Sequence, residues 1–133
     1  MIAYYTQAHQ LDPAWVDGKA QEAAASFCDP VRVIRPHQPI KSAQLRKFYT
    51  DVKTQERRWI AAGSDDAAFA VVLPMLKLLK AKSEYACNRK VVPPSFCKWL
   101  WAHVDSVNTA EDFRAFLLHF EAVVGFSYQW LHD

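Results

Sequence analysis

The side chains most able to do chemistry in this sequence are the lysines and arginines of residues 41–90. The 133-residue chain has a formal net charge of only +2, yet this stretch holds eleven Lys and Arg against five Asp and Glu. Basic charge concentrated on a near-neutral chain is typical of a site for a polyanion, and also of a solvated helix face. From charge alone, nucleic-acid binding and a solvated helix face are therefore about equally well supported.

Three of these cations are spaced to share one side of a helix expected over residues 43–61, AQLRKFYTDVKTQERRWIA. At about 100° per residue, Arg46, Lys53 and Arg57 project within about 40° of one another, beside an apolar stripe. Long cationic side chains in a row on a rigid helix can meet successive phosphates of a nucleic acid. We expect this row to be unpaired.

A second cationic group lies on residues 69–89, FAVVLPMLKLLKAKSEYACNR, the stretch that we expect to organise the core. Its apolar positions fall on one broad face, whereas Lys82, Tyr85 and Arg89 share a flank. Pro74 has no N–H and crowds the carbonyl one turn earlier, so we favour a helix that restarts there over a longer, kinked helix. Weaker candidates for the same partner are Arg57, Lys41, Lys77, Lys80 and Lys90.

Catalysis and metal binding have little support. The five histidines, at positions 9, 37, 103, 119 and 132, have no HxxxH spacing, and the cysteines have no CxxC spacing. His103 and His119 lie on apolar helices and should be hydrogen-bonded core residues, and Cys87 and Cys97 should be small buried hydrophobes. We expect no catalytic residue, no metal ligand and no cofactor.

Composition and spacing predict an all-α fold, a compact bundle of four to five helices in one domain over residues 1–133. Hydrophobic residues make up 51% of the chain, their clear spacings are helical, and three Gly leave few positions for hairpin turns. Three cysteines without paired spacing, and an N-terminus without a leader-like segment, predict a reduced, cytoplasmic protein. No apolar run approaches the roughly 20 residues of a membrane span, so we expect no membrane contact.

Residues 1–40 are expected to form a peripheral N-terminal arm on a helical core of residues 41–133. In the arm, Asp12 is placed to cap a helix that ends before Asp29, and the proline-rich residues 31–40 are typical of an extended connector. The arm is the part of the chain that the sequence describes least well.

Two more helices are expected after the stiff VVPP joint that follows the basic stretch. Ser95 is the expected N-cap of a short, nearly all-apolar helix, and Asn108 or Thr109 that of the last helix. The aromatic stripe of the last helix should pack on the stripe of residues 43–61. The aromatic tail, residues 126–133, is either a patch between subunits or part of the core.

Three segments form an ordered set: SAQLRKFYTDVK, VLPMLKLLKAKSEYACNR and EDFRAFLLHFEAVVGF. They match the patterns L-R-x-F/Y-x-x-x-V-K, L-P-x-L-K-x-x-x-A-K-x-x-Y-A-x-x-R and F-x-x-F-x-x-x-F-E-A-V/I-V. In order and separation the set resembles the small subunit of the type III-A CRISPR effector, the Csm complex. The resemblance covers about residues 41–126.

The resemblance implies a small all-helical, non-catalytic subunit that stacks in several copies and binds RNA without reading its sequence. The partners it implies are RNA, through the backbone of the target strand and of the guide–target duplex, other Csm subunits, and further copies of itself. The matching basic positions are Arg46, Lys53, Lys82 and Arg89. The alternative hypothesis is a helical protein-interaction module without intrinsic RNA binding, whose charged helices meet acidic protein partners.

Overall fold

The computed structural model describes residues 1–131, which form five α-helices and one short 3-10 helix. The elements are η1 Pro13–Val16, α1 Gly18–Cys28, α2 Ser42–Ala61, α3 Asp66–Asn88, α4 Pro94–Ser106 and α5 Ala110–Ser127. Within the described residues the strand-like structure is limited to an isolated antiparallel bridge between Tyr5 and Leu11. The expected all-α fold is confirmed.

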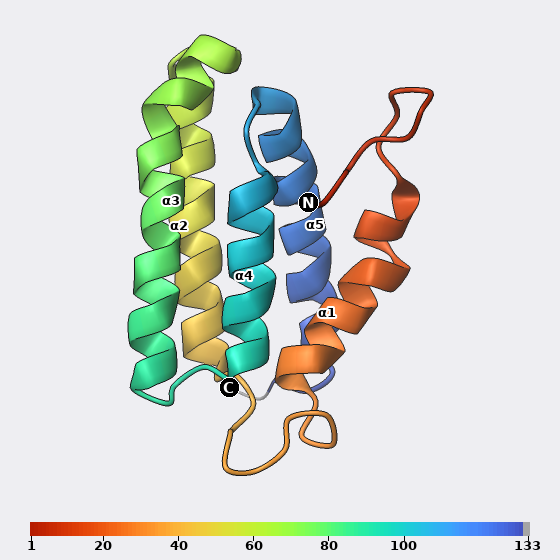
Figure 1. Cartoon of the computed structure of the whole chain (residues 1–133), viewed down its shortest axis with the longest axis vertical. Helices are drawn as coiled ribbons and strands as arrows, with labels where there is room; N and C mark the ends of the chain where they lie inside the picture. Colours follow the sequence, from red (N-terminus) through yellow and green to blue (C-terminus); the bar gives the residue numbers. More distant parts are fainter. Residues whose placement is uncertain (132–133) are drawn as a thin grey trace.

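The five α-helices stand side by side as a bundle, with α2 and α3 at one side and α1 at the other (Figure 1). α3 packs against α2 and α4, while α1 packs against α5, α4 and η1. Each α-helix contributes a fully buried large side chain to one connected core, for example Phe27, Phe48, Leu76, Phe96 and Phe116. The core therefore extends through the whole bundle.

α2 and α5 pack through their aromatic stripes, as the spacing predicts. The Tyr49 ring lies 5.3 Å from the Phe120 ring, and the Trp59 ring lies 5.4 Å from the Phe113 ring. Because a residue late in α2 meets a residue early in α5, the two helices run antiparallel.

α2 and α3 are also antiparallel. The Trp59 indole N–H near the end of α2 donates to the carbonyl of Asp65, just before α3 begins. Further along, Lys82 of α3 meets Asp51 of α2. α3 and α5 therefore run parallel, and the start of α2 lies at the same end of the bundle as their last turns (Figure 1).

The N-terminal segment belongs to the core, so the expected peripheral arm is wrong for most of its length. Tyr4 is 1% exposed, Trp15 9%, and Phe27 of α1 is fully buried. The small alanines of α1 let that helix approach α5 closely, a role that an Ala-rich sequence does not distinguish from a solvated helix. The connector after α1 fits the expectation better, because Val31 and Ile34 are exposed there.

α3 is continuous from Asp66 to Asn88 with Pro74 inside it, so the expected restart is wrong. Pro74 and Ala70 are both exposed, so water can reach the Ala70 carbonyl that the proline leaves without an N–H partner. The buried face of α3 includes Val72 and Leu76, as the spacing predicts.

The expected N-caps are confirmed for one helix and wrong for another. Thr109 caps α5, because its hydroxyl accepts the N–H of Asp112 at 3.1 Å. α4 instead begins at Pro94, whose missing N–H suits the first turn of a helix. Ser95 is inside α4, and its hydroxyl donates to the Ser26 carbonyl at 2.7 Å, which joins α4 to α1.

Candidate nucleic-acid interface

One end of the bundle is basic, because the start of α2 and the end of α3 meet there. Residues 41–47 contain three cations and no acid, and residues 82–90 contain three cations and one acid. All six cations are exposed, and we call them the basic end: Lys41, Arg46, Lys47, Lys82, Arg89 and Lys90. The opposite end, where α3 and α5 begin, carries Asp65, Asp66, Glu111 and Asp112. The bundle is therefore charged asymmetrically along its axis, and a polyanion is attracted to one end of it.

Lys53 is not part of an unpaired row. Its ammonium forms an ion pair with Glu56, less than one turn later in α2. The hydrogen bond to Glu56 raises the pKa of Lys53 above its ordinary value. Arg57 donates to the Thr54 hydroxyl at 3.1 Å, and no carboxylate among residues 1–131 pairs with it. The expected unpaired row is therefore wrong at Lys53, because Glu56 lies on the same side of the helix.

The two predicted basic groups lie on opposite flanks of α2. Lys53 is on the flank toward α5, where the charge of Glu121 adds to the effect of Glu56 on its pKa. Lys82 instead meets Asp51 at 3.5 Å, and the side chain of Asp51 leaves α2 about 160° away from that of Lys53. Within one copy, Lys53 and Lys82 therefore do not share a surface.

Lys77 and Lys80 face α4. The Lys80 ammonium lies 2.7 Å from Asp105 Oδ1, and it also lies 4.6 Å from the centre of the Trp101 ring. The Lys77 ammonium donates to the Val104 carbonyl at 3.1 Å. These contacts join α3 to α4, so both lysines have a structural role that their spacing did not indicate.

Arg89 and Lys90 close α3 without an acidic partner among residues 1–131. The Arg89 guanidinium lies 5.5 Å from the centre of the Tyr85 ring, and the exposed ring and guanidinium form a cation–π pair. Lys90 follows in a left-handed turn with φ of 63°. Of the weaker candidates, Lys41 is likewise exposed and without a carboxylate partner in the described chain.

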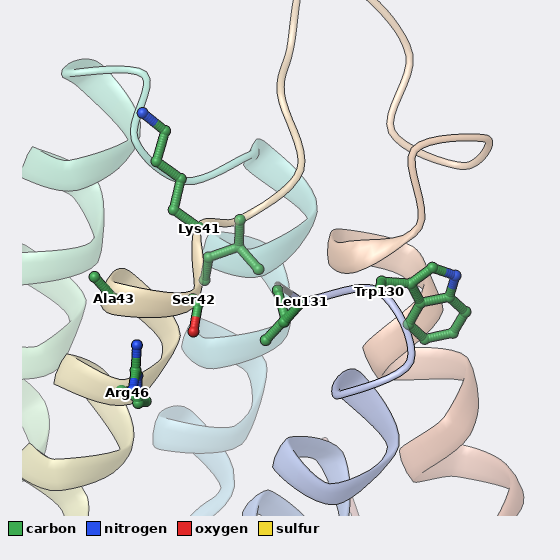
Figure 2. A pocket seen from close by; sticks show the side chains of 7 residues that line it. Lys41, Ser42, Ala43, Arg46, Trp130 and Leu131 are labelled. Carbon is green, nitrogen blue, oxygen red and sulfur yellow. The ribbon is translucent and has the colours of Figure 1, made fainter. Parts of the chain in front are cut away.

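An open groove of about 560 Å³ lies at the basic end, between the start of α2 and the C-terminal segment. Figure 2 shows Lys41 and Arg46 on the α2 side of this groove and Trp130 on the far side. Trp130 and Leu131 are half-buried against the core, so this part of the aromatic tail packs on its own chain. The last two residues of the tail, 132 and 133, lie outside the described residues.

A buried polar network lies beneath the N-terminal segment. The rings of His103 and His119 stack 4.5 Å apart, and the Tyr4 hydroxyl lies 2.7 Å from His103 Nδ1. The Trp99 indole N–H donates to His119 Nε2 at 3.0 Å, so His119 Nδ1 carries the proton that it donates to the Trp15 carbonyl at 2.5 Å. Both histidines are hydrogen-bonded core residues, as expected, but nothing in the sequence indicated that they meet each other.

Other chemistry-bearing groups are dispersed in the described part of the chain. Among residues 1–131, no three His, Cys, Asp or Glu side chains gather as metal ligands would, and His132 lies outside this range. The three cysteines are free, with Cys28 and Cys97 buried; burial raises the pKa of Cys28 to about 11 and that of Cys97 to about 12. None of the helices in the described residues is long and apolar enough to cross a membrane.

The fold and the site define a small all-helical bundle whose cations gather at one end. Comparison with protein families then identifies the family, because the model of Csm2 Type III-A matches residues 18–129. The chain belongs to this family and is a small subunit of the type III-A CRISPR effector complex. The match begins at α1, so it includes a helix that the three sequence segments left out. Comparisons with curated proteins and with solved structures find no match.

Proposed function

We propose that this subunit is a non-catalytic RNA-binding protein that holds target RNA by its backbone within a cytoplasmic effector. The observation that carries the proposal is the basic end, six exposed cations on the ends of two rigid helices. Contacts to phosphates need only such side chains and read no sequence. Membership of the family supports this function, since pairing with a guide RNA supplies the specificity in RNA-guided effectors.

The contacts of the basic residues suggest different roles for them. Arg89, Lys90 and Lys41 are exposed cations without a carboxylate partner in residues 1–131, and Arg46 lies beside Lys41 on the groove. We place these four in direct contact with the RNA backbone. Lys53 and Lys82 each pair with a carboxylate within one copy, and we propose that each can exchange that carboxylate for an RNA phosphate. We place Arg57 at the edge of the RNA path.

Several copies in a row should bind better than one. A single basic end offers only a few phosphate contacts, so one copy alone should bind weakly, whereas stacked copies gain from effective concentration. If about four phosphates are neutralised per copy, the slope of log K against log salt should be roughly −3 for single-stranded RNA. We propose that copies stack along the target strand and the guide–target duplex, beside other Csm subunits.

Fluorescence anisotropy with labelled single-stranded RNAs of unrelated sequence tests the proposal at several salt concentrations. The double variant Arg89→Gln/Lys90→Gln should reduce the size of the salt slope by about 1.4, since two phosphate contacts are lost. The matched control Lys77→Gln/Lys80→Gln removes the same charge from residues that contact α4, and it should leave the slope nearly unchanged. Equal loss in both variants, with folding verified by circular dichroism, would mean that net charge and not the basic end binds RNA.

Exposed apolar side chains on α3 favour the alternative, a protein-interaction module. Val71 is 72% exposed and Leu78 43% exposed, and neither contributes to an electrostatic contact with RNA. Tight binding to one purified effector subunit, together with no affinity for RNA at low salt, would support this alternative.

A further inference from the structure

The outward side of α3 carries a row of exposed side chains with the spacing of a helix–helix seam. Six residues follow one another at alternating steps of four and three and are all exposed; we call them the α3 seam: Val71, Met75, Leu78, Lys82, Tyr85 and Arg89. This alternation places side chains in one straight line along a helix and is the spacing of coiled-coil contacts. The first half of the seam is apolar, which is unusual for a face in water.

α5 carries a second exposed row with the same spacing. Five residues form it, and we call them the α5 stripe: Arg114, Leu118, Glu121, Gly125 and Tyr128. Leu118 is 41% exposed and Tyr128 64% exposed. Apart from its chain neighbours and its own helix backbone, a Cβ built on Gly125 meets no atom within 4 Å, so this glycine leaves an open notch in the row.

The α3 seam and the α5 stripe are complementary in charge and shape. Each has a charged residue near its middle, Lys82 between Leu78 and Tyr85 in the seam and Glu121 between Leu118 and Gly125 in the stripe. When these two are brought together with the helices parallel, Leu78 falls opposite Leu118, Tyr85 opposite the Gly125 notch and Arg89 opposite Tyr128. The antiparallel direction would instead bring Arg89 opposite Arg114, a like-charge contact that disfavours it. The Lys82 ammonium is half exposed and only 3.5 Å from Asp51, so it can be shared with a second carboxylate.

Pairing of two α3 seams with each other is much less favourable. Such a symmetric contact would bring the Lys82 and Arg89 side chains of both copies into one interface, with four cations and no acid of the seam to balance them. Like charges across an interface cost several kcal/mol and suppress that pairing. Charge complementarity therefore selects the α5 stripe as the occupant of the α3 seam.

We infer that the α3 seam of one copy docks on the α5 stripe of the next copy, with Lys82 and Glu121 at the centre of the contact. Because two different surfaces meet, the contact is heterologous, and it leaves one free seam and one free stripe on every pair. Copies then add one after another instead of closing into a dimer. The biological use of this contact rests on the proposed stacking along RNA, whereas the docking can be tested without RNA.

Docking also joins the two basic groups that one copy keeps apart. Glu121 lies on the flank of α2 that carries Lys53, close enough to raise its pKa after the larger effect of Glu56. A Lys82 that docks on Glu121 is therefore brought to the Lys53 flank of the next copy. In the assembly Lys82 then pairs with Glu121 instead of a phosphate, and the exposed Arg89 and Lys90, two turns further along the chain, continue the basic surface toward the Lys53 flank.

Sedimentation velocity over a concentration series of the full chain tests the inference. The weight-average mass of the wild type should rise beyond that of a dimer. Gly125→Gln should weaken association at least tenfold while raising the melting temperature, because Gln suits a helix better than Gly and has open space there. The matched control is Gly18→Gln, at the other helical glycine with no atom within 4 Å, and it should leave association unchanged.

A charge exchange tests the central pair. Lys82→Glu and Glu121→Lys should each weaken association at least tenfold, and the double variant Lys82→Glu/Glu121→Lys should restore it to within a few fold. A wild type that stays monomeric at every concentration overturns the inference, as does a dimer that is insensitive to Gly125→Gln. Failure of the double variant to recover overturns the Lys82–Glu121 contact.

Binding to RNA separates this inference from the proposed function. On an RNA long enough for only one copy, Gly125→Gln should bind like wild type, and on a long RNA it should lose cooperativity. A wild type that binds the short RNA but never self-associates refutes the docking and leaves the proposed function standing. Self-association without RNA binding would support the docking and refute the proposed function.

Discussion

At the scale of residues, His103 and His119 hold the N-terminal segment against α4 and α5 in their neutral forms. Burial lowers the pKa of His103 to about 2, and burial also lowers that of His119. In the unfolded chain both have a pKa of about 6.5. Below that pH the unfolded state binds protons that the folded state does not bind. The contribution of the two histidines to stability is therefore present above pH 6.5 and is lost as the pH falls.

We expect the free energy of unfolding to fall below pH 6.5 with a slope that approaches about 1.4 kcal/mol per pH unit from His103, with a contribution of the same sign from His119. Urea unfolding at pH 7.5, 6.5 and 5.5 measures this slope. His103→Gln should remove the His103 part of the slope, about 1.4 kcal/mol per pH unit, whereas His37→Gln, in the exposed connector, should leave the slope unchanged. The same slope in His103→Gln and in wild type would contradict the role of the buried network.

Thr109 is a second residue with a defined energetic role, because its hydroxyl caps α5. It accepts the Asp112 N–H at 3.1 Å, and the Asp112 carboxylate accepts the Asn108 N–H at 3.2 Å. Thr109→Ala should cost about 1 kcal/mol of stability, whereas Thr109→Ser keeps the acceptor and should cost much less. Thermal unfolding of both variants measures the difference. Equal losses of stability in the two variants would mean that the hydroxyl cap does not account for the contribution of Thr109.

At the scale of elements, α3 contains a proline in its interior. An interior proline costs up to about 3 kcal/mol through the lost hydrogen bond and the clash with the preceding turn. Pro74 is exposed, so Pro74→Ala should restore the N–H without disturbing the core and raise stability by about 1 to 3 kcal/mol. Urea unfolding tests this, with the exposed Val71→Ala expected to change stability by less than about 0.5 kcal/mol. A loss of stability in Pro74→Ala would mean that packing requires the local geometry set by the proline.

Helix periodicity predicted α2, α3 and α5 well because each has large apolar side chains on one face. Phe48, Leu76 and Phe116 are buried as their spacing indicates. α1 could not be placed in the same way, since a helix rich in alanine buries a face that carries little hydrophobic signal. The restart at Pro74 was wrong because an exposed proline in a long, well-packed helix is tolerated when tertiary contacts hold both halves.

The candidate site was predictable as a set of cations but not as a surface. Spacing along α2 correctly put Arg46 and Lys53 on one side, yet it carried no information on which neighbour that side meets. The partner of Lys80 is Asp105, in another helix and 25 residues away. Such pairings depend on the packing of helices, which one sequence does not contain.

At the scale of the whole molecule, the basic end and the hydrophobic core depend on different parts of the chain. The basic end arises because α2 starts where α3 ends, so an antiparallel pair brings together cations from both. The core instead depends on the N-terminal segment, which adds Tyr4 and Trp15 over the aromatic cluster of α4 and α5. Stability should therefore respond to changes in the N-terminal segment that leave the basic end untouched.

Removal of residues 1–17 tests that separation. These residues precede the part of the chain that the family model matches, and a peripheral arm would be dispensable. Here Trp15 is 9% exposed and covers both histidines, with ring centres 5.5 Å and 5.2 Å away. We expect the truncated chain to lose most of its cooperative unfolding, and the milder Trp15→Ala to cost about 3 to 5 kcal/mol.

Urea unfolding measures both effects, and the double variant Val31→Ala/Ile34→Ala in the exposed connector is the control, with a change within about 0.5 kcal/mol. RNA anisotropy on Trp15→Ala, under conditions where it is folded, should match wild type because the basic end lies on α2 and α3. A truncated chain as stable as wild type would mean that residues 1–17 are a peripheral arm and not part of the core. A loss of RNA binding in folded Trp15→Ala would mean instead that the core and the basic end are coupled, since α4 and α5 would then transmit the change to the start of α2.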